Sequence, residues 1–406
     1  MALVVQKYGG SSVADAGKIR NVARRIAAVK DKGNDVVVTV SAMGNTTDEL
    51  IGLAYQLNEH PDGRELDALL STGEVVSSTL LAMALEAMGY EAISLTGGQA
   101  GIRTDATYRR ARILKVESKR VVKELEKGNI VIVAGFQGIT EDMDVTTLGR
   151  GASDTTAVAL AASLGAESCE IYTDVEGVYT ADPQIVAEAK PLAEIGYEEM
   201  LELASHGAKV MHARAVELGE LYNIPILVAS SFTGKPGTLI HGGVSMEVRN
   251  KVRGIAHDLD VAKITVVGVP DRPGIAAAIF EPLAAANISI DTIVQNASID
   301  NITDLTFTVS RGQLDEVMKV IGPITKEIGA RECVSDATLG KVSIVGTGMQ
   351  NMPGFAARMF SALSEKGINI QLIATSEIRI TCIVDEARVK DAVRALHRAF
   401  ELDVGD

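Results

Sequence analysis

The stretch Leu3-Val4-Val5-Gln6-Lys7-Tyr8-Gly9-Gly10-Ser11-Ser12 decides the fold of the first half of the chain. Its apolar beginning predicts a buried strand from Leu3 to Tyr8, and the glycine pair predicts a tight turn where that strand ends. From Val13 to Val29, apolar residues then recur at spacings of three and four, which predicts a helix with one face against a sheet. This succession is typical of an α/β domain.

The same alternation of short apolar runs and amphipathic segments continues to about residue 230 and predicts a mainly parallel sheet between helices. Further candidate strands, several of them apolar on both faces, are Asp35–Ser41, Glu91–Leu95, Ile130–Ala134, Cys169–Thr173 and Ile224–Ala229. The segment from Phe232 to Val244 is rich in glycine and turn-forming residues, so we place the end of this domain near residue 245.

Beyond this boundary the chain contains an internal repeat. Pro273-Gly274, Phe280, Leu283, Ile288, Ile290 and Ile293 recur 80 positions later as Pro353-Gly354, Phe360, Leu363, Ile368, Ile370 and Ile373. Each copy predicts the order strand, helix, strand, strand, helix. In the first copy the expected strands are Lys263–Val269, Ser289–Gln295, Asp304–Val309 and one after Ala330, with helices from Pro273 and Gln313. Such a unit forms a small sandwich of helices on an antiparallel sheet.

Composition limits the functions that the chain can have. With 406 residues, two or three domains are expected, and 47% apolar against 23% charged residues argues for a folded chain. The formal net charge of -14 argues against a nucleic-acid or anionic membrane partner, since both need a basic face. It does not exclude an anionic substrate, which a few convergent cations in a cleft can bind.

Cysteine and histidine usage excludes several kinds of site. Cys169, Cys333 and Cys382 are odd in number and far apart, so we expect no disulfide framework or zinc knuckle, which fits a reducing cytoplasm. No leader-like N-terminus and no stretch close to a membrane span is evident, and we expect a soluble cytoplasmic protein. His206 and His212 lack metal-ligand spacing and are interpreted, like the other histidines, as structural or surface residues. No nucleophile elbow occurs either, so covalent catalysis has little support.

Three segments are candidates for chemistry. In the first, Lys7 and the Gly9-Gly10 turn can form a phosphate cradle at a helix N-terminus, although no Walker A loop is present and a plain turn with a surface lysine remains an alternative. In the second, Thr147–Thr156, Ser153 or Asp154 can simply cap a helix, but Arg150 between two glycines is suited to grip a carboxylate or phosphate. The third, Cys169–Pro183, is a strand ending in a polar loop, where open α/β sheets bind ligands, although its Glu-Gly and Asp-Pro pairs are also ordinary turn chemistry.

Five motifs in order resemble those of the aspartate kinases of the amino-acid kinase superfamily. They are K-Y-G-G-S-S-V at Lys7–Val13, V-S-A-M-G at Val40–Gly44, S-T-G-E at Ser71–Glu74, T-L-G-R-G-A-S-D-T-T at Thr147–Thr156 and T-D-V-E-G-V-Y-T-A-D-P at Thr173–Pro183. The repeat, with P-D-R-P-G at Pro270–Gly274 and A-T-S-E-I-R-I at Ala374–Ile380, resembles the tandem ACT domains of the same family. The likeness covers essentially the whole chain.

The resemblance implies a fold and a domain plan. The fold is an α/β carbamate kinase-like αβα sandwich with a mainly parallel sheet, followed by two ferredoxin-like βαββαβ ACT domains. The catalytic domain is expected at residues 1–245 and the first ACT domain at 263–336, inserted in a second one made of 252–262 plus 337–406. In this plan Val252–Leu259 pairs with the second copy.

The resemblance also implies roles for individual residues. The reaction is transfer of the γ-phosphate of ATP, with Mg²⁺, to the β-carboxylate of L-aspartate. Lys7 and Asp154 are expected to be catalytic, with Asp154 holding Lys7 in position. Aspartate is expected to bind at Ser41, Thr47, Glu74, Phe136, Arg150 and Ser153. The nucleotide is expected at Lys7, Gly9, Gly10, Ser11, Thr173, Asp174, Tyr179, Asp182, Pro183, Gln184 and Lys209, with no direct metal ligand assigned.

Two positions depart from the family pattern: Ala152 stands where Gly is frequent, and Gln184 stands where Arg is common, which puts one nucleotide contact in doubt.

Regulation is implied in the same way. Lysine, threonine or both are expected as effectors at Asp271, Ile288, Asp291, Gln295, Asn369 and Ile370, with Ser298 and Thr306 nearby. A homodimer or higher oligomer is expected, and an internal start at Met246 would give a separate regulatory subunit. Two rival functions stay open: another carboxylate or carbamate kinase of the same fold, and a catalytically silent amino-acid sensor.

Overall fold

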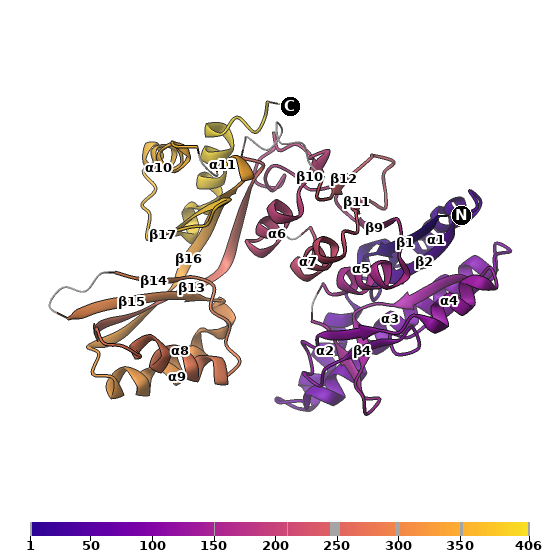
Figure 1. Ribbon diagram of the computed structural model, residues 1–406, viewed down its shortest axis with the longest axis horizontal. Coiled ribbons are helices and arrows are strands. Elements are labelled where there is room, and N and C mark those ends of the chain that lie inside the picture. Colours follow the sequence, from indigo (N-terminus) through magenta and orange to yellow (C-terminus); the bar gives the residue numbers. More distant parts are fainter. Residues whose placement is uncertain are drawn as a thin grey trace. The chain divides into compact units, whose positions relative to one another are not determined.

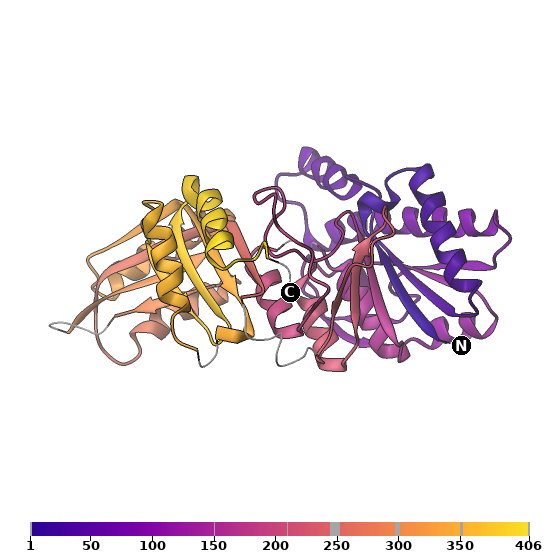
Figure 2. The ribbon, with the colours of Figure 1, turned by 90° about the horizontal axis from the view of Figure 1, so that it is seen from above.

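The computed structural model describes residues 2–149, 151–208, 210–243, 252–296, 301–349 and 352–404. The chain divides into two compact units, one made of Met1–Tyr179 and Pro191–Val248 and the other of Thr180–Lys190 and Arg249–Asp406. Figure 1 labels the elements of both units, and Figure 2 gives a second view of each.

A mainly parallel sheet forms the centre of the first unit. Within its described residues, eight strands follow the order β10-β12-β11-β9-β1-β2-β6-β3. All adjacent pairs are parallel except β11 with β12. The strands are β1 Leu3–Tyr8, β2 Asp35–Val40, β3 Ala92–Leu95, β6 Ile130–Ala134, β9 Ser168–Thr173, β10 Glu194–Ile195, β11 Ile226–Ser230 and β12 Thr238–Ile240. The α/β fold with a mainly parallel sheet is therefore confirmed.

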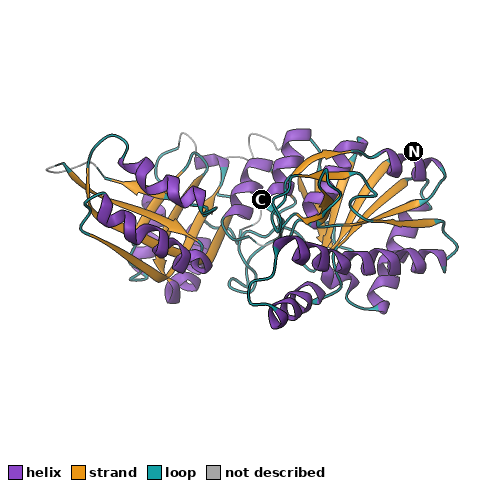
Figure 3. Cartoon of the chain, turned by 90° about the horizontal axis from the view of Figure 1, so that it is seen from below, coloured by secondary structure: helices purple, strands orange, loops and turns teal. Residues whose placement is uncertain are grey.

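Helices cover both faces of this sheet (Figure 3). The helices are α1 Ala16–Lys30, α2 Thr46–Leu57, α3 Gly63–Glu86, α4 Lys119–Glu126, α5 Ser153–Leu164, α6 Tyr197–Ser205 and α7 Ala213–Tyr222. On one face, α1 and α3 share a core with β1, β2 and β6 through residues such as Ile26, Leu81 and Val38. On the other face α5 packs on β1 and β2, so alternate residues of β1, Lys7 among them, point toward α5.

A smaller sheet in the same unit has the strand order β5-β4-β7-β8. Its strands are β4 Ile102–Thr104, β5 Ile113–Val116, β7 Gln137–Ile139 and β8 Val145–Thr147. Among the described helices, α3 alone is long and apolar enough to cross a membrane by length and composition. The sequence interpretation had recognised no such segment. Half of that apolar window is buried, and the helix carries the buried Asp67 and Glu74, as a core helix does.

The second unit is built on a curled antiparallel sheet. In its described part the strand order is β14-β15-β13-β16-β18-β17. The strands are β13 Gly254–Pro270, β14 Ile293–Gln295, β15 Ile302–Val309, β16 Glu332–Val345, β17 Leu372–Thr375 and β18 Arg379–Asp385, and the helices are α8 Ile275–Ala285, α9 Leu314–Glu327, α10 Phe355–Glu365 and α11 Val389–Ala399. The expected strand Ser289–Gln295 is shorter than predicted, since only Ile293–Gln295 pairs with β15.

Strands β13 and β16 each serve both copies of the repeat. Gly254–Asp258 pairs with Lys341–Val345, while Lys263–Val267 pairs with Glu332–Asp336 further along the same two strands. One core forms under α8 and α9 and another under α10 and α11. Val294 of β14 and Ala374 of β17 pack against the same small cluster on the opposite face, which shows how far the sheet curls.

An excursion of the chain, Thr180–Lys190, belongs to this second unit. Ala181, Ile185 and Val186 are buried in the core under α10 and α11. The Thr180 hydroxyl lies 3.0 Å from Nε2 of His397, and Nε of Arg394 donates to the Ile185 carbonyl at 3.0 Å. The excursion leaves and re-enters the first unit at Tyr179 and Pro191, which form a β-bridge.

Candidate active site

The carboxyl ends of four neighbouring parallel strands gather the candidate residues of the first unit. Strand β1 ends before Gly9, β2 before Ser41, β6 before Gly135 and β9 before Asp174. Since β9, β1, β2 and β6 are adjacent and parallel, these four positions lie along one edge of the sheet. This edge is where open α/β sheets bind ligands.

A buried ion pair stands at this edge. Nζ of Lys7 lies 2.7 Å from Oδ1 of Asp154, and the two side chains are only 11% and 8% exposed. The backbone N–H of His212 donates to Oδ2 of Asp154 at 3.3 Å. Lys7 comes from β1 and Asp154 from the first turn of α5, so the sheet and the helix together hold one ammonium in place.

The glycine turn after β1 is closely packed. The Gly9 N–H donates to the Tyr172 carbonyl, and a Cβ on Gly10 would come within 2.7 Å of the Ala42 carbonyl oxygen. The turn continues as a 3-10 helix, η1 Gly10–Val13, and α1 begins only at Ala16 with Asp15 as its N-cap. The helix N-terminus that stands at the cradle is therefore that of η1, with Gly9 at its N-cap position and no side-chain cap, whereas α1 begins later and is capped by Asp15. Whether this N-terminus contributes to phosphate binding stays a prediction.

Glu74 is a buried carboxylate with a spare oxygen. It lies in α3, is 3% exposed, and its Oε1 accepts the Ala42 N–H at 3.1 Å. Its Oε2 has no hydrogen-bond partner among the described residues. Burial raises the pKa of Glu74 to about 7, because desolvation disfavours the charged form. An orphaned oxygen of this kind is suited to receive a ligand ammonium.

Asp67 holds the loop that leads to Arg150. It is fully buried in α3, and its carboxylate accepts the Thr147 N–H at 2.8 Å, the Thr147 hydroxyl at 2.7 Å and the Arg109 N–H at 2.8 Å. Burial raises the pKa of Asp67, and these three hydrogen bonds oppose the rise. Arg150 itself lies outside the described residues, while its neighbours Gly149 and Gly151 have φ values of 92° and 76°, which only glycine adopts easily.

The remaining residues predicted to bind aspartate lie in different surroundings. Ser153 begins α5 and is buried next to Asp154. Ser41 follows β2 and Thr47 lies in the first turn of α2, both half-buried. Phe136 follows β6, is 7% exposed, and packs with Leu66 and Leu148 in a core cluster. Its φ of 68° is unusual for a bulky residue, and its N–H donates to the Thr156 hydroxyl.

The predicted nucleotide residues divide between the units. Thr173, Asp174 and Tyr179 follow or end β9 in the first unit, where the Tyr179 hydroxyl and Nζ of Lys235 both donate to Oε2 of Glu176. Asp182, Pro183 and Gln184 lie in the excursion that belongs to the second unit, with Pro183 and Gln184 exposed. Lys209 lies outside the described residues. No group of three or more His, Cys, Asp or Glu side chains that could hold a metal occurs in the described part of the chain.

The predicted effector residues lie in the second unit. Asp271 and Gln295 are exposed, as is Asn369, whereas Ile288 is 6% exposed and lies in the core under α8 and α9. Ile370 is half-buried against the core under α10 and α11. Asp291 forms an ion pair with Lys341, and Thr306 bonds Thr265 across two strands. Ser298 and Met246 lie outside the described residues.

Sequence reasoning missed three residues that support the candidate site. Asp67 was not singled out, although an acidic residue amid the apolar positions of a long helix is a usable signal. His212 was interpreted as structural or surface, whereas its N–H contacts Asp154 and its Nδ1 is buried without a partner among described residues. A Cβ on Gly135 would lie 2.8 Å from Thr39 Cγ2 and 2.9 Å from Ser153 Cβ, a close approach that no local pattern reveals.

Comparisons with known proteins agree along the whole chain. Residues 2–230 match the amino acid kinase family, and residues 263–323 and 342–400 each match an ACT domain. The chain is 51% identical over 405 residues to an aspartate kinase of Stutzerimonas stutzeri, covering 99% of this chain and 98% of that one. Among solved structures, E. coli aspartokinase III in complex with aspartate and ADP aligns with a TM-score of 0.83 at 24% identity, covering 98% of this chain and all of that one. The same enzyme in complex with lysine and aspartate gives 0.73 at 25% identity, with 98% and 99% coverage.

Proposed function

The chain belongs to the aspartate kinases of the amino acid kinase family, and from this premise we propose how its residues perform and regulate the reaction. The activity is transfer of the γ-phosphate of ATP to the β-carboxylate of L-aspartate, which gives 4-phospho-L-aspartate and ADP. This is the first step of the aspartate pathway to lysine, threonine and methionine. The observation that carries the residue assignment is the buried Lys7–Asp154 pair at the carboxyl edge of the parallel sheet.

Lys7 stabilises the transferring phosphoryl group. The β-carboxylate is already anionic at neutral pH, so it attacks the γ-phosphorus without losing a proton and no general base is needed. The difficulty is to bring two anions into line, and a fixed ammonium lowers the energy of the charge that develops on the phosphoryl oxygens. Asp154 keeps the Lys7 ammonium aimed at that point, at 2.7 Å from its own carboxylate. Gly10 and Ser11 line the same turn, where the absence of a Cβ on Gly10 allows the close packing.

Glu74 and Arg150 bind opposite ends of the aspartate backbone. The orphaned Oε2 of Glu74 receives the α-ammonium, and Arg150 grips the α-carboxylate with two parallel hydrogen bonds. Ser41, Thr47, Phe136 and Ser153 are proposed as further substrate contacts. Asp67 supports this arrangement, since it ties down Thr147 three residues before Arg150.

ATP is proposed to lie against Gly9, Gly10 and Ser11 with its phosphates and against Thr173, Asp174 and Tyr179 with its base and sugar, while Asp182, Pro183, Gln184 and Lys209 supply further contacts. A Mg²⁺ ion is proposed to be held mainly by the ATP phosphates and water, with no protein ligand assigned. When bound, Mg²⁺ neutralises charge on the β- and γ-phosphates.

The second unit is proposed to be regulatory. Its division into ACT domains at 263–336 and at 252–262 plus 337–406, after a catalytic domain at 1–245, is supported by the double use of β13 and β16. Lysine, threonine or both are the proposed effectors, and contacts at Asp271, Ile288, Asp291, Gln295, Asn369 and Ile370 are the proposed site. A homodimer or higher oligomer, with or without a subunit that starts at Met246, is also proposed.

Aspartate-dependent ADP formation with Mg-ATP tests the catalytic assignment. We expect Lys7→Ala to lower kcat by about 10²- to 10³-fold, because one preorganised charge on the developing anion is lost. Lys30→Ala is the matched control, since Lys30 ends α1 and pairs with Asp35 away from the edge. Wild-type kcat in Lys7→Ala would refute the role of Lys7. Turnover only with other carboxylates, or none at all, would instead support the rival kinase or the silent sensor.

A further inference from the structure

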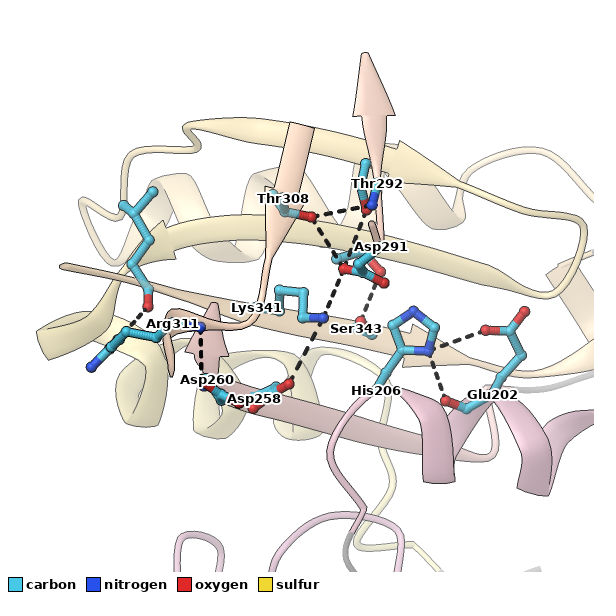
Figure 4. A network of polar contacts seen from close by, with 12 residues as sticks. Glu202, His206, Asp258, Asp260, Asp291, Thr292, Thr308, Arg311, Lys341 and Ser343 are labelled. Carbon is cyan, nitrogen blue, oxygen red and sulfur yellow. Dashed lines mark hydrogen bonds and ion pairs between the residues drawn. The ribbon is translucent and has the colours of Figure 1, made fainter. Parts of the chain in front are cut away.

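Lys341 has a buried ammonium with two carboxylates in reach. Its side chain is 6% exposed on β16, and Nζ lies 2.8 Å from Oδ2 of Asp291 and 3.8 Å from Oδ2 of Asp258 (Figure 4). A buried ammonium requires a counter-charge, and one carboxylate is enough to supply it. Asp258 and Asp291 thus offer Lys341 a choice of two partners.

The repeat shows which partner belongs to the basic plan. In the register of β13 and β16, Lys341 lies beside Asp258, and Lys263 lies beside Asp336. Both aspartates also accept a backbone N–H from the residue two positions on. Each copy therefore sets a strand lysine beside an aspartate of the neighbouring strand.

The copies differ at the position of Asp291. The Asp291 N–H donates to the Thr308 carbonyl in the first copy, and the Gln371 N–H donates to the Ile383 carbonyl in the corresponding place of the second. A glutamine amide is neutral, so only the first copy presents a carboxylate there. The ammonium of Lys341, which comes from the second copy, donates to that carboxylate.

The Asp291 carboxylate is also open to solvent. Its side chain is 33% exposed, and Oδ2 accepts the Thr308 hydroxyl at 3.2 Å as well as the Lys341 ammonium. A small ammonium compound arriving from solution therefore reaches an acceptor that is already oriented. To bind there it must compete with the ammonium of Lys341.

We propose that the effector's amino group binds Asp291 by displacing Lys341, which then pairs with Asp258. This inference rests on the proposed regulatory role of Asp291. One ammonium replaces another on the same carboxylate, and the displaced one keeps a counter-charge that is already 3.8 Å away. Because β16 runs through both copies, the movement of Lys341 couples effector binding in the first copy to the strand that forms the second. The neutral Gln371 excludes the same exchange at the corresponding site of the second copy.

The exchange predicts opposite effects for two substitutions in the full-length chain. Isothermal titration with L-lysine and, separately, L-threonine gives the dissociation constant, and inhibition of ADP formation gives the half-inhibitory concentration. Lys341→Met removes the competing ammonium from Asp291, and we expect both values to fall about three- to tenfold, the range for a partly exposed ion pair. Asp258→Asn removes the alternative partner, and we expect both values to rise by a similar factor. Lys263→Met, the matched lysine of the other copy, should leave them unchanged.

The outcomes separate this inference from the function on which it rests. If the wild type binds neither amino acid, the regulatory role of Asp291 and the exchange both fail. If the wild type binds one of them but Lys341→Met binds it no better or less well, the exchange alone fails, since Lys341 then holds the bound effector or the fold. If Asp258→Asn binds it more tightly, the alternative partner is wrong. A cooperative unfolding transition of the second unit in all three variants, together with unchanged kcat without effector, would show that each still folds.

Discussion

Replacing Glu74 with glutamine tests how the aspartate site is prepared for its ligand. The carboxylate is 3% exposed, one oxygen accepts the Ala42 N–H, and the other has no partner among the described residues. The site is therefore arranged to be complete only when a cation arrives. Glu74→Gln keeps the size of the side chain and removes the charge, so it separates charge from packing.

The magnitude follows from the pKa. Burial raises the pKa of Glu74 from 4.5 to about 7, and at about 1.4 kcal/mol per pH unit, ionised Glu74 destabilises the empty native state by about 3 kcal/mol. The native pKa is above the unfolded one, so the native state binds more protons between these values and stability falls as pH rises. The destabilisation is absent below about pH 4.5 and complete above about pH 7. Glu74→Gln should thus gain stability over the wild type between pH 5 and 8, approaching about 3 kcal/mol.

The assay is chemical denaturation of the full-length chain, in which the transition of the kinase unit is followed at pH 5, 6 and 8 with and without aspartate. Aspartate should stabilise the wild type more at pH 8 than at pH 6, and the KM for aspartate should fall over that interval as Glu74 ionises. Both effects should vanish in Glu74→Gln. Glu86→Gln, an exposed position on the same helix, is the control. A difference in stability between Glu74→Gln and wild type that stays constant from pH 5 to pH 8 would refute the reasoning.

Three further substitutions test the supports of the site. Asp67→Asn leaves at least one of the three groups that donate to Asp67 poorly paired, so we expect the free energy of unfolding to fall by about 1–3 kcal/mol and the KM for aspartate to rise in steady-state kinetics. An unchanged KM for aspartate would contradict this role. Gly135→Ala sets a Cβ within 2.9 Å of the Val40 carbonyl oxygen. In urea denaturation we expect the free energy of unfolding to fall by about 1–3 kcal/mol, together with a lower kcat. Unchanged stability would show that the carboxyl edge of the sheet relaxes around the added methyl group. Ile185→Ala should lower the free energy of unfolding of the second unit by about 2–5 kcal/mol, because Ile185 is buried in its core. It should also raise the KM for ATP but not that for aspartate, because Ile185 anchors the excursion that carries Asp182–Gln184. Equal changes in both KM values would argue against this.

Much of the fold was predictable because its signals are local. Strands β1 and β6 lie at the predicted residues, since runs of apolar residues bounded by turn formers need no distant partner to be recognised. The repeat of the second half was visible for the same reason. The predicted start of α1 was too early, at Val13 instead of Ala16. The apolar period already begins within η1, and the Asp15 side chain caps the helix that follows.

The candidate site was predictable in its residue types and, through the family resemblance, in one contact, that of Asp154 with Lys7, but not in its other contacts. Motifs named Lys7, Glu74 and Asp154, and whether all the predicted site residues act as proposed stays a prediction. Lys7 and Asp154 pair although they lie 147 positions apart in the chain.

The sequence by itself determined the α/β order, the doubled C-terminal unit and the set of charged residues available for phosphoryl transfer. Only the tertiary structure decided that Asp67 meets Thr147 and that Lys341 meets Asp291 rather than Asp258 alone. The reason is physical. Periodicity and turn chemistry act between near neighbours in the chain, whereas the burial of a charge and the choice of its partner depend on which strands and helices pack together.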